Sequence, residues 1–302
     1  MSATRKRPFV SVIIPVYNDE NRIGLAIEAL LKQTYPKDRF EIIVVDNGST
    51  DDTKKVADNC RVRLLEETET QSSYASRNKG MAEARGSIYA FTDADCIPEP
   101  GWIEGGVWAL LDNQAELAAG RVRFPLTPRS SAAEYYDALC NIRIKDNVET
   151  RGVAFTANLF VCKEVVDSIG PFPQRIRSGG DVFFTSRATT AGHKIVYAGQ
   201  AIVEHPARDL RGLLLKSLRI GKGKLSILNK ARQDNTMNPG IKPGRFLTDL
   251  NPFILRQRLI EDEFLVGTGK YLGIVAVAYL VLFTMLIGAF MELFHRGRYS
   301  DQ

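Results

Sequence analysis

The sequence predicts an α/β protein in which helices cover both faces of a mainly parallel sheet, followed by membrane-associated helices and one transmembrane helix. Short apolar segments alternate with helical segments four times in about the first 95 residues. Several apolar segments end in stretches rich in carboxylates, and an uncharged segment of 21 residues lies near the C-terminus. Strands that alternate with helices favour right-handed crossovers and parallel pairing.

The first alternations have clear boundaries. Asn18 or Asp19 is expected to cap the first helix, and Gly86 is expected to close the third. The elements predicted in this region are strand 10–15, helix 20–33, strand 41–45, a short helix after Asp51, strand 62–65, helix 74–85, strand 88–92 and helix 101–113.

The order is less regular after residue 113. We predict strand 117–124, helix 132–141, strand 153–161, helix 181–191, and short strands at 194–197 and 201–204. His205 and Pro206 then close the globular part. The predicted domains are therefore a globular α/β domain at 1–205, a basic amphipathic membrane-interface segment at 206–269, and a transmembrane helix with a short tail at 270–302.

The C-terminal third carries the features of a membrane-bound segment. Residues 206–270 hold thirteen Lys or Arg against six Asp or Glu, and leucines alternate with these cations at 210–230. This mixture, like that at 253–264, favours helices at the cytosolic leaflet. Three glycines, Gly212, Gly221 and Gly223, make one unbroken helix at 210–230 doubtful.

Residues 271–291 contain no charge and as a helix would extend about 32 Å, close to the roughly 30 Å of a bilayer core. A buried core helix is the alternative. The N-terminal apolar run 9–15 is too short for a signal peptide, so we expect a single-pass C-terminal anchor with the large domain in the cytosol. Four cysteines without metal-site spacing are expected to be reduced thiols.

The stretch 87–98 carries the candidate chemistry. Asp93 and Asp95 follow an apolar strand directly. Residues i and i+2 of an extended segment point to the same side, so both carboxylates can face one hard cation such as Mg²⁺ or Mn²⁺. Such a pair also occurs in ordinary turns and helix caps. Ligands of parallel sheets collect at the carboxyl ends of the strands, where residues 15–18, 46–51 and 93–95 are expected to meet.

Four ordered blocks resemble family 2 glycosyltransferases. They read VSVIIPVYNDE at 10–20, IIVVDNGSTDDT at 42–53, YASRNKG at 74–80 and FTDADCIP at 91–98. The resemblance covers residues 9–205. It implies the GT-A fold, a Rossmann-like mainly parallel sheet with helices on both faces, and inverting transfer from a nucleotide-diphosphate sugar with a divalent metal.

The resemblance also implies roles for residues that would hold the nucleotide. Asp46 would accept hydrogen bonds from the base, Pro15 and Tyr17 would shape the base and ribose site, and Glu20 would lie nearby. Arg77 matches an arginine placed near the nucleotide, and its alternative role is an ion pair with a neighbouring helix residue. For Asp46, Pro15, Tyr17 and Glu20, the alternative role is to form turns or helix caps. We expect Asn18, Asp51 and Asp52 to have that role.

Asp93 and Asp95 would hold Mn²⁺ or Mg²⁺ against the diphosphate, and His205 is a further candidate ligand, with a structural histidine as the alternative. Asp181 stands where the family carries the general base at the end of a Glu-Asp pair. Here Gly180 replaces the acidic partner, so a helix cap is the competing role. The Gln-X-X-Arg-Trp block of processive synthases is absent.

The resulting hypothesis is an inverting glycosyltransferase that acts on a hydroxyl of a glycan or lipid-linked saccharide at the cytosolic membrane face. Its expected partners are the sugar nucleotide, the acceptor and membrane lipids, with no nucleic acid. A polyprenyl-phosphate glycosyltransferase and a non-catalytic scaffold that binds sugar nucleotides are the alternatives. A phosphatase of the haloacid-dehalogenase type fits poorly, because its aspartate pair follows the first strand.

Overall fold

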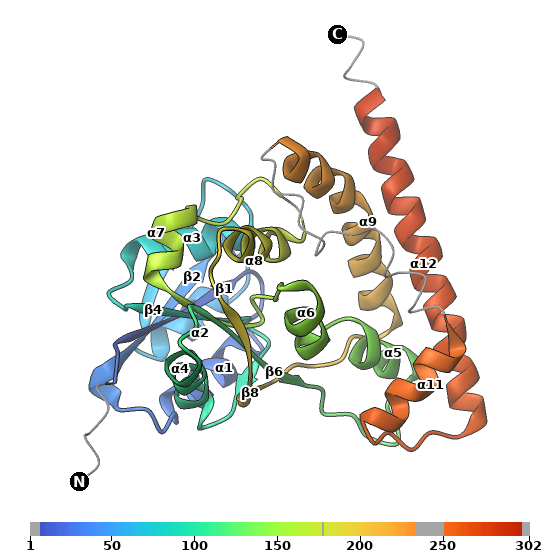
Figure 1. Cartoon of the computed structure of the whole chain (residues 1–302), viewed down its shortest axis with the longest axis horizontal. Coiled ribbons are helices and arrows are strands. Elements are labelled where there is room, and N and C mark those ends of the chain that lie inside the picture. Colours follow the sequence, from blue (N-terminus) through green and yellow to red (C-terminus); the bar gives the residue numbers. More distant parts are fainter. Residues whose placement is uncertain (1–6, 177, 234–250, 298–302) are drawn as a thin grey trace. The chain divides into compact units, whose positions relative to one another are not determined.

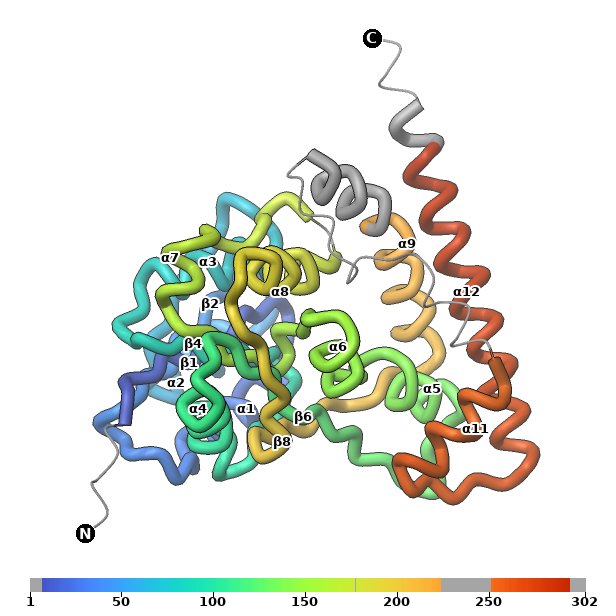
Figure 2. Tube along the Cα trace, in the orientation of Figure 1, coloured from blue at the N-terminus to red at the C-terminus, as the bar shows by residue number. Residues whose placement is uncertain are grey.

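The computed structural model describes residues 7–176, 178–233 and 251–297, with the side chains of 224–233 and 294–297 left out. The chain divides into two compact units. The first contains residues 1–123, 144–175 and 184–205, and the second contains 124–143, 176–183 and 206–302. Figure 1 labels the elements of both, and Figure 2 follows the chain through them.

The first unit is built on one mixed sheet. Its described strands form an eight-stranded sheet in the order β3-β2-β1-β4-β7-β6-β8-β5. The strands are β1 (Val10–Val16), β2 (Phe40–Asp46), β3 (Arg63–Glu66), β4 (Ile88–Thr92), β5 (Ile97–Pro98), β6 (Leu117–Arg123), β7 (Asn158–Cys162) and β8 (Ile195–Glu204). Strands β3, β2, β1 and β4 run parallel, as predicted, whereas β7 is antiparallel to both β4 and β6.

Helices cover both faces of this sheet. They are α1 (Ile23–Leu31), the 3-10 turn η1 (Lys37–Arg39), α2 (Thr53–Asn59), α3 (Ser73–Glu83), α4 (Trp102–Asn113), α6 (Ile144–Arg151), α7 (Lys163–Ile169) and α8 (Gly180–Thr190). In Figure 1, α3 and α8 lie on one side of the sheet and α1 and α4 on the other. The α/β fold class predicted from the alternation is confirmed.

The main core lies between the sheet and helices α1, α2 and α4. Apolar residues at alternate positions of β1, such as Val12 and Ile14, meet Ile23 and Ile27 of α1 and Trp102 of α4 in one buried cluster. The opposite β1 face is equally apolar: Ile13 contacts α3 at Gly80, where an added Cβ would lie 2.5 Å from the Ile13 side chain. Both faces of the central strands are therefore buried, as continuous apolar strands require.

The parallel register places three strand ends together. Val16 of β1 pairs with Asp46 of β2, and β1 also pairs with β4, which ends at Thr92 directly before Asp93. The prediction that residues 15–18, 46–51 and 93–95 meet at one sheet edge is confirmed.

Several details differ from the predicted elements. The strand expected at 153–161 begins only at Asn158, and helices α6 and α7 were not predicted. The two short strands at 194–197 and 201–204 are one strand, β8, whose pairing with β6 shifts register after Gly120. The first helix begins at Ile23 without a side-chain cap, because Asp19 instead accepts the Arg22 and Ile23 amides through its backbone oxygen.

The second unit is a helical assembly. Its helices are α5 (Ala132–Cys140), α9 (Leu210–Gln233), α11 (Pro252–Glu261) and α12 (Thr268–Gly297). Leu139, Leu213, Leu255, Ile274 and Ala278, which come from all four helices, belong to one fully buried cluster. Residues 124–143 thus share a core with the C-terminal helices, although a boundary at residue 205 was the sequence prediction.

Helix α9 is continuous, and the prediction that its glycines interrupt it was wrong. Figure 2 shows α9 and α12 side by side. A Cβ on Gly221 would lie 2.1 Å from the Met285 carbonyl oxygen, and one on Gly288 would lie 2.3 Å from that of Leu218. The glycines let two helix backbones approach closely, which is the use of small residues at helix crossings. Tertiary packing therefore offsets their low helix propensity.

Among the described residues, one helix segment is long and apolar enough to cross a membrane, Thr268–Leu293 of α12. This agrees with the predicted span at 271–291 by length and composition. The segment 253–264 was predicted to be amphipathic, and α11 occupies most of it.

Candidate active site

Asp46 is the buried carboxylate at the end of β2. Its side chain is fully buried, and Oδ2 accepts hydrogen bonds from the amides of Gly48 and Ser49, each at 3.0 Å. Its other oxygen, Oδ1, is buried without a hydrogen-bond partner among the described residues. An unpaired buried carboxylate oxygen is costly, and it points to a ligand donor that the protein itself does not supply.

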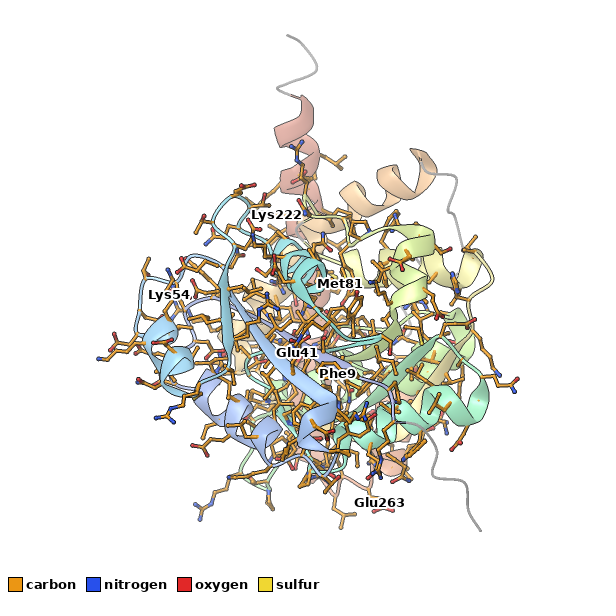
Figure 3. The ribbon with its side chains drawn as sticks, turned by 90° about the vertical axis from the view of Figure 1, so that its left-hand side faces the viewer. Phe9, Glu41, Lys54, Met81, Lys222 and Glu263 are labelled. Atoms are coloured by element: carbon orange, nitrogen blue, oxygen red, sulfur yellow. The ribbon has the colours of Figure 1, made fainter. Side chains whose placement is uncertain are left out.

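Lys54 of α2, labelled in Figure 3, is a cation close to this carboxylate. Its Nζ lies 2.7 Å from Oε2 of Glu66 and 3.9 Å from Oδ2 of Asp46. The hydrogen bond with Glu66 outweighs partial desolvation and raises the pKa of Lys54. Lys54 therefore stays charged beside the end of β2.

The loops after β1 and β2 are joined by side-chain caps. Asn18, in the left-handed region at φ 48°, accepts the Thr50 amide at 2.8 Å through Oδ1. Glu20 accepts the Asp52 amide at 2.9 Å and so supports the start of α2. Asp51 accepts from the amide and hydroxyl of Thr53, as expected of a turn residue, whereas the Asp52 side chain makes no cap hydrogen bond. Glu20 thus holds the loop shape.

Pro15 and Tyr17 flank the same loop. Pro15 is buried in β1 opposite Val45, whereas Tyr17 is 49% exposed immediately beyond the strand. An exposed aromatic ring at the carboxyl end of a central strand is available for stacking on a base. The structure leaves the Tyr17 ring accessible, and its role in a base and ribose site stays a prediction.

Arg77 joins α3 to the β4 end. The side chain is almost fully buried, and its Nη2 donates to Oδ1 of Asp93 at 2.5 Å while Nη1 donates to the Ser73 carbonyl at 3.3 Å. Its Nε is buried without a hydrogen-bond partner among the described residues. Within the described part of the chain, Arg77 forms its ion pair with Asp93 and not with a residue of its own helix, which was the predicted alternative. The guanidinium thus orients Asp93.

Asp93, Asp95 and His205 come together around one point. One ligand atom from each of these residues and from Cys96 lies within 4.8 Å of the others. Nε2 of the buried His205 is 3.9 Å from Oδ1 of Asp95. Donor atoms on opposite sides of a small hard cation are about 4.2 Å apart, so modest side-chain movement would bring them into coordination distance. Two carboxylates and an imidazole suit Mn²⁺ or Mg²⁺.

Cys96 and Arg22 are members of this region that the sequence analysis did not single out. Burial, together with the nearby Asp93 and Asp95, raises the pKa of the Cys96 thiol well above its usual value, so it is protonated and a poor ligand for a hard cation. Arg22 lies 2.7 Å from Asp19 and 3.6 Å from Oδ2 of Asp95. Its position follows from the turn after β1, which no local pattern reveals.

The β8 end is fixed by charge pairs around His205. The His205 amide donates to the Arg123 carbonyl at 2.9 Å, and the Arg123 guanidinium binds Glu99 at 2.5 Å and Glu204 at 2.6 Å. Behind these, Asn158 accepts the Trp102 indole N–H and donates to the Arg121 and Ala201 carbonyls. The bulged β8 strand is thus held so that His205 reaches Asp95.

Asp181 belongs to the second unit. It lies in the first turn of α8, is half-buried, and its Oδ1 accepts the Val182 amide at 2.8 Å. A carboxylate at a helix N-terminus is stabilised as the anion. Both predicted roles, general base and helix-start residue, are compatible with this position, and its role as base stays a prediction.

The first unit therefore brings a buried carboxylate with an unpaired oxygen, a guanidinium and a group of potential metal ligands to one sheet edge. Comparison with known proteins identifies the class as a glycosyltransferase. A model of Glycosyl transferase family 2 matches residues 11–160. Glycosyltransferase AglE of Haloferax volcanii is 45% identical over 231 residues, covering 74% of this chain and 75% of that protein. The chain belongs to glycosyl transferase family 2.

More distant relatives and solved structures are also similar to this chain. The O-antigen chain rhamnosyltransferase WbaN of Salmonella anatum is 26% identical over 210 residues, 66% of each chain. Mannosyltransferase PcManGT from Pyrobaculum calidifontis, in complex with GDP-Man and Mn²⁺, matches with a TM-score of 0.69 at 20% identity, over 95% of this chain and 88% of that one. S. aureus TarS 1–349 in complex with UDP matches with a TM-score of 0.53 at 17% identity, over 96% of this chain and 91% of that one. These likenesses establish the GT-A-like fold.

Proposed function

We propose that this enzyme transfers a sugar from a nucleotide-diphosphate sugar to a hydroxyl of a glycan or lipid-linked saccharide, with inversion, at the cytosolic face of a membrane. The observation that carries the proposal is the shared sheet edge of Asp46 and the Asp93–Asp95–His205 group. A base acceptor and a cation site for the diphosphate at one edge match the two ends of the nucleoside diphosphate portion of a sugar nucleotide.

In this proposal the nucleotide lies along the ends of β1, β2 and β4. Oδ1 of Asp46 accepts a hydrogen bond from an N–H group of the base, so this otherwise unpaired oxygen gains a partner. Tyr17 stacks on the base, Pro15 shapes the backbone beneath it, and Glu20 maintains the loop. Arg77 holds Asp93 through a charge-assisted hydrogen bond and so aims it at the diphosphate side.

Asp93, Asp95 and His205 would hold a divalent cation, which supplies charge neutralisation for the departing nucleoside diphosphate. The imidazole ligand favours Mn²⁺ over Mg²⁺, since Mg²⁺ prefers an all-oxygen shell. Arg22 is the present counter-charge of Asp95, at 3.6 Å. It is expected to swing away from Asp95 when this carboxylate binds the ion. The PcManGT structure with GDP-Man and Mn²⁺ supports a manganese site.

Asp181 is the proposed general base. Inversion requires a group that takes the acceptor proton on the face of the sugar opposite the leaving diphosphate. The helix start stabilises the Asp181 anion. The acceptor hydroxyl is assigned to this carboxylate.

Two alternatives make different demands on Asp181. A polyprenyl-phosphate acceptor is already ionised and needs no base, so Asp181→Ala would retain full turnover. A non-catalytic scaffold would bind donor but never transfer sugar to any acceptor. The hydroxyl-acceptor proposal expects Asp181→Ala to lose turnover by about 10²-fold or more while donor affinity is kept.

The first experiment is a thermal-shift screen of uridine and guanosine diphosphate sugars with and without Mn²⁺. A ligand that binds the folded state raises its melting temperature by mass action. We expect one base to stabilise the protein, and to do so more strongly with Mn²⁺, with this increment lost in Asp95→Asn. Absence of any shift for every donor would contradict the proposal.

A further inference from the structure

Helix α12 has two different faces. One face is buried within the second unit and contains Ile274, Val277, Ala278, Val281 and Met285. The other is an exposed apolar stripe along the whole helix, which contains Leu272, Tyr279, Leu280, Phe283, Leu286, Ile287, Phe290, Met291 and Leu293. No residue of this stripe is charged. A stripe of this length on a water-exposed helix indicates a surface that is covered by another apolar phase.

The buried face contacts other helices of the second unit. Near its start, α12 approaches α5, where a Cβ on Gly273 would lie 3.0 Å from that of Ala132. Farther along, it approaches α9 at Gly288, where an added Cβ would lie 2.3 Å from the Leu218 carbonyl oxygen. Both halves of the segment Thr268–Leu293 are therefore flanked by other helices of the same unit.

These flanking helices carry charges that do not fit a bilayer interior. Helix α5 begins with a capping box of Ser131 and Glu134. Its buried Asp137 binds Arg208 at 3.2 Å and Lys216 of α9 at 3.8 Å. If α12 crossed the membrane upright in this assembly, these groups and the exposed Arg219 would enter the hydrocarbon, where ionised side chains are strongly disfavoured.

Detachment of α12 from the unit would leave its partners uncovered. Leu213 and Leu255 are fully buried, and Leu259 nearly so, within the cluster that α12 completes. The close backbone approach at Gly221 and Gly288 would also be lost. The geometry is consistent with a helix that stays docked through one face and leaves only the other for lipid.

We propose that α12 lies in the plane of the membrane surface as a monotopic anchor, with its exposed stripe among the acyl chains, and does not cross the bilayer. This replaces the single-pass anchor expected from hydropathy. The occupant of the stripe is a bilayer containing anionic lipid, because the adjacent α9 exposes Arg211, Leu215 and Arg219 on one side at helical spacing. Cations beside an apolar stripe match the headgroup and acyl layers of such a membrane.

The direct test measures the depth of three points of the stripe. An environment-sensitive fluorescent amino acid is placed at position 272, 283 or 290 of the full-length protein by codon suppression, and the protein is bound to vesicles of neutral and anionic phospholipid. Quenchers are attached at the headgroup or deep in the acyl chain. Positions 272 and 283 are about 16 Å apart along a helix axis. We expect the same shallow depth at all three positions.

A membrane-crossing helix would place position 283 near the bilayer centre and the other two near its surfaces. That depth profile would overturn the proposal. A helix that pairs with a second copy would give no quenching at any position and a dimer in light scattering without vesicles, and this result would overturn it too.

A matched pair of variants tests the surface independently. Phe283→Glu puts a charge into the stripe, whereas Leu25→Glu puts one at a similarly exposed leucine of α1, 56% exposed against 64% for Phe283. In flotation with anionic vesicles, Phe283→Glu should weaken binding about tenfold or more and Leu25→Glu should not. Equal binding of both variants would contradict the assignment, and wild-type melting temperatures confirm that both are folded.

Discussion

Asp46 combines a structural role with the proposed binding role in one carboxylate. One oxygen closes the loop after β2 through two amides, and the other is buried without a partner among the described residues. An asparagine or a serine at this position could also accept the hydrogen bonds that close the loop. The unpaired Asp46 oxygen therefore indicates a hydrogen-bond donor that comes from a ligand.

We expect Asp46→Asn to lower the affinity for nucleoside diphosphate by about 10-fold to 100-fold, because an amide presents one acceptor and one donor where two acceptors stood. Isothermal titration with Mn²⁺ present measures the change. Asp52→Asn, at a side chain 70% exposed on the same loop, is the control and should bind normally. Equal losses in both variants would show that loop disturbance alone explains the effect.

Asp137 gives a residue-scale prediction for pH. Burial raises the pKa of this carboxyl, but the attraction of Lys216 and Arg208 and the hydrogen bonds from Arg208 and Asn141 outweigh it, so the pKa is lowered. A lowered folded pKa means that the stabilisation is complete above the unfolded pKa of about 3.9 and is lost as the pH falls through the folded pKa.

Asp137→Asn should therefore destabilise the fold by about 3 kcal/mol at pH 7, and the difference from wild type should shrink below about pH 4. Chemical denaturation at several pH values measures both. Asp38→Asn, at a side chain 77% exposed, should show no such difference. A pH-independent difference for Asp137→Asn would mean that packing, and not charge, is lost.

Residue patterns predicted part of the site. Asp46, Asp93 and Asp95 were found because strand ends are visible in sequence and parallel pairing aligns them. His205 joins them through β8, which is paired with β6 far along the chain, so its position depended on the family resemblance. Arg22 has no local signal, because its contact with Asp95 is tertiary. Cys96 adjoins Asp95 in the sequence, but its full burial beside these carboxylates follows from the fold.

At the scale of elements, glycines decide how α9 and α12 meet. Helix propensity predicts that Gly221 interrupts α9, yet the helix continues through it. The missing side chain at Gly221 leaves room for the Met285 carbonyl of α12, and this close packing stabilises the helix. Helix propensity is a local quantity and contains no information on such contacts. The same reason explains why α6 and α7, which have short patterns, were missed.

Gly221→Ala should destabilise the protein, although alanine favours a helix by about 1 kcal/mol, because the added Cβ would lie 2.1 Å from a backbone oxygen. Overpacking of this kind costs about 1–3 kcal/mol or more. Gly269→Ala, in the first turn of α12 with open space around it, is the matched control and should be neutral or stabilising. Melting temperatures compare the two, and a stabilised Gly221→Ala would contradict the close helix contact.

At the scale of the whole molecule, the chain joins a family 2 catalytic fold to a helical unit with an exposed apolar stripe. The alternation of strands and helices predicted the α/β class of the first, because local periodicity encodes it, and the family resemblance predicted its GT-A fold. The boundary between the units was harder to see, since residues 124–143 leave the sheet and share a core with the C-terminal helices α9, α11 and α12.

The central claim is that this sheet edge performs metal-dependent sugar transfer. The most direct measurement is release of nucleoside diphosphate from the donor identified by the binding screen, in the presence of acceptor-containing membranes. Wild type and Asp95→Asn are compared, each after chelation and after re-addition of Mn²⁺. We predict that chelation abolishes wild-type turnover, that Mn²⁺ restores it, and that Asp95→Asn stays at least about 10²-fold slower. Turnover that survives both chelation and Asp95→Asn would contradict the account.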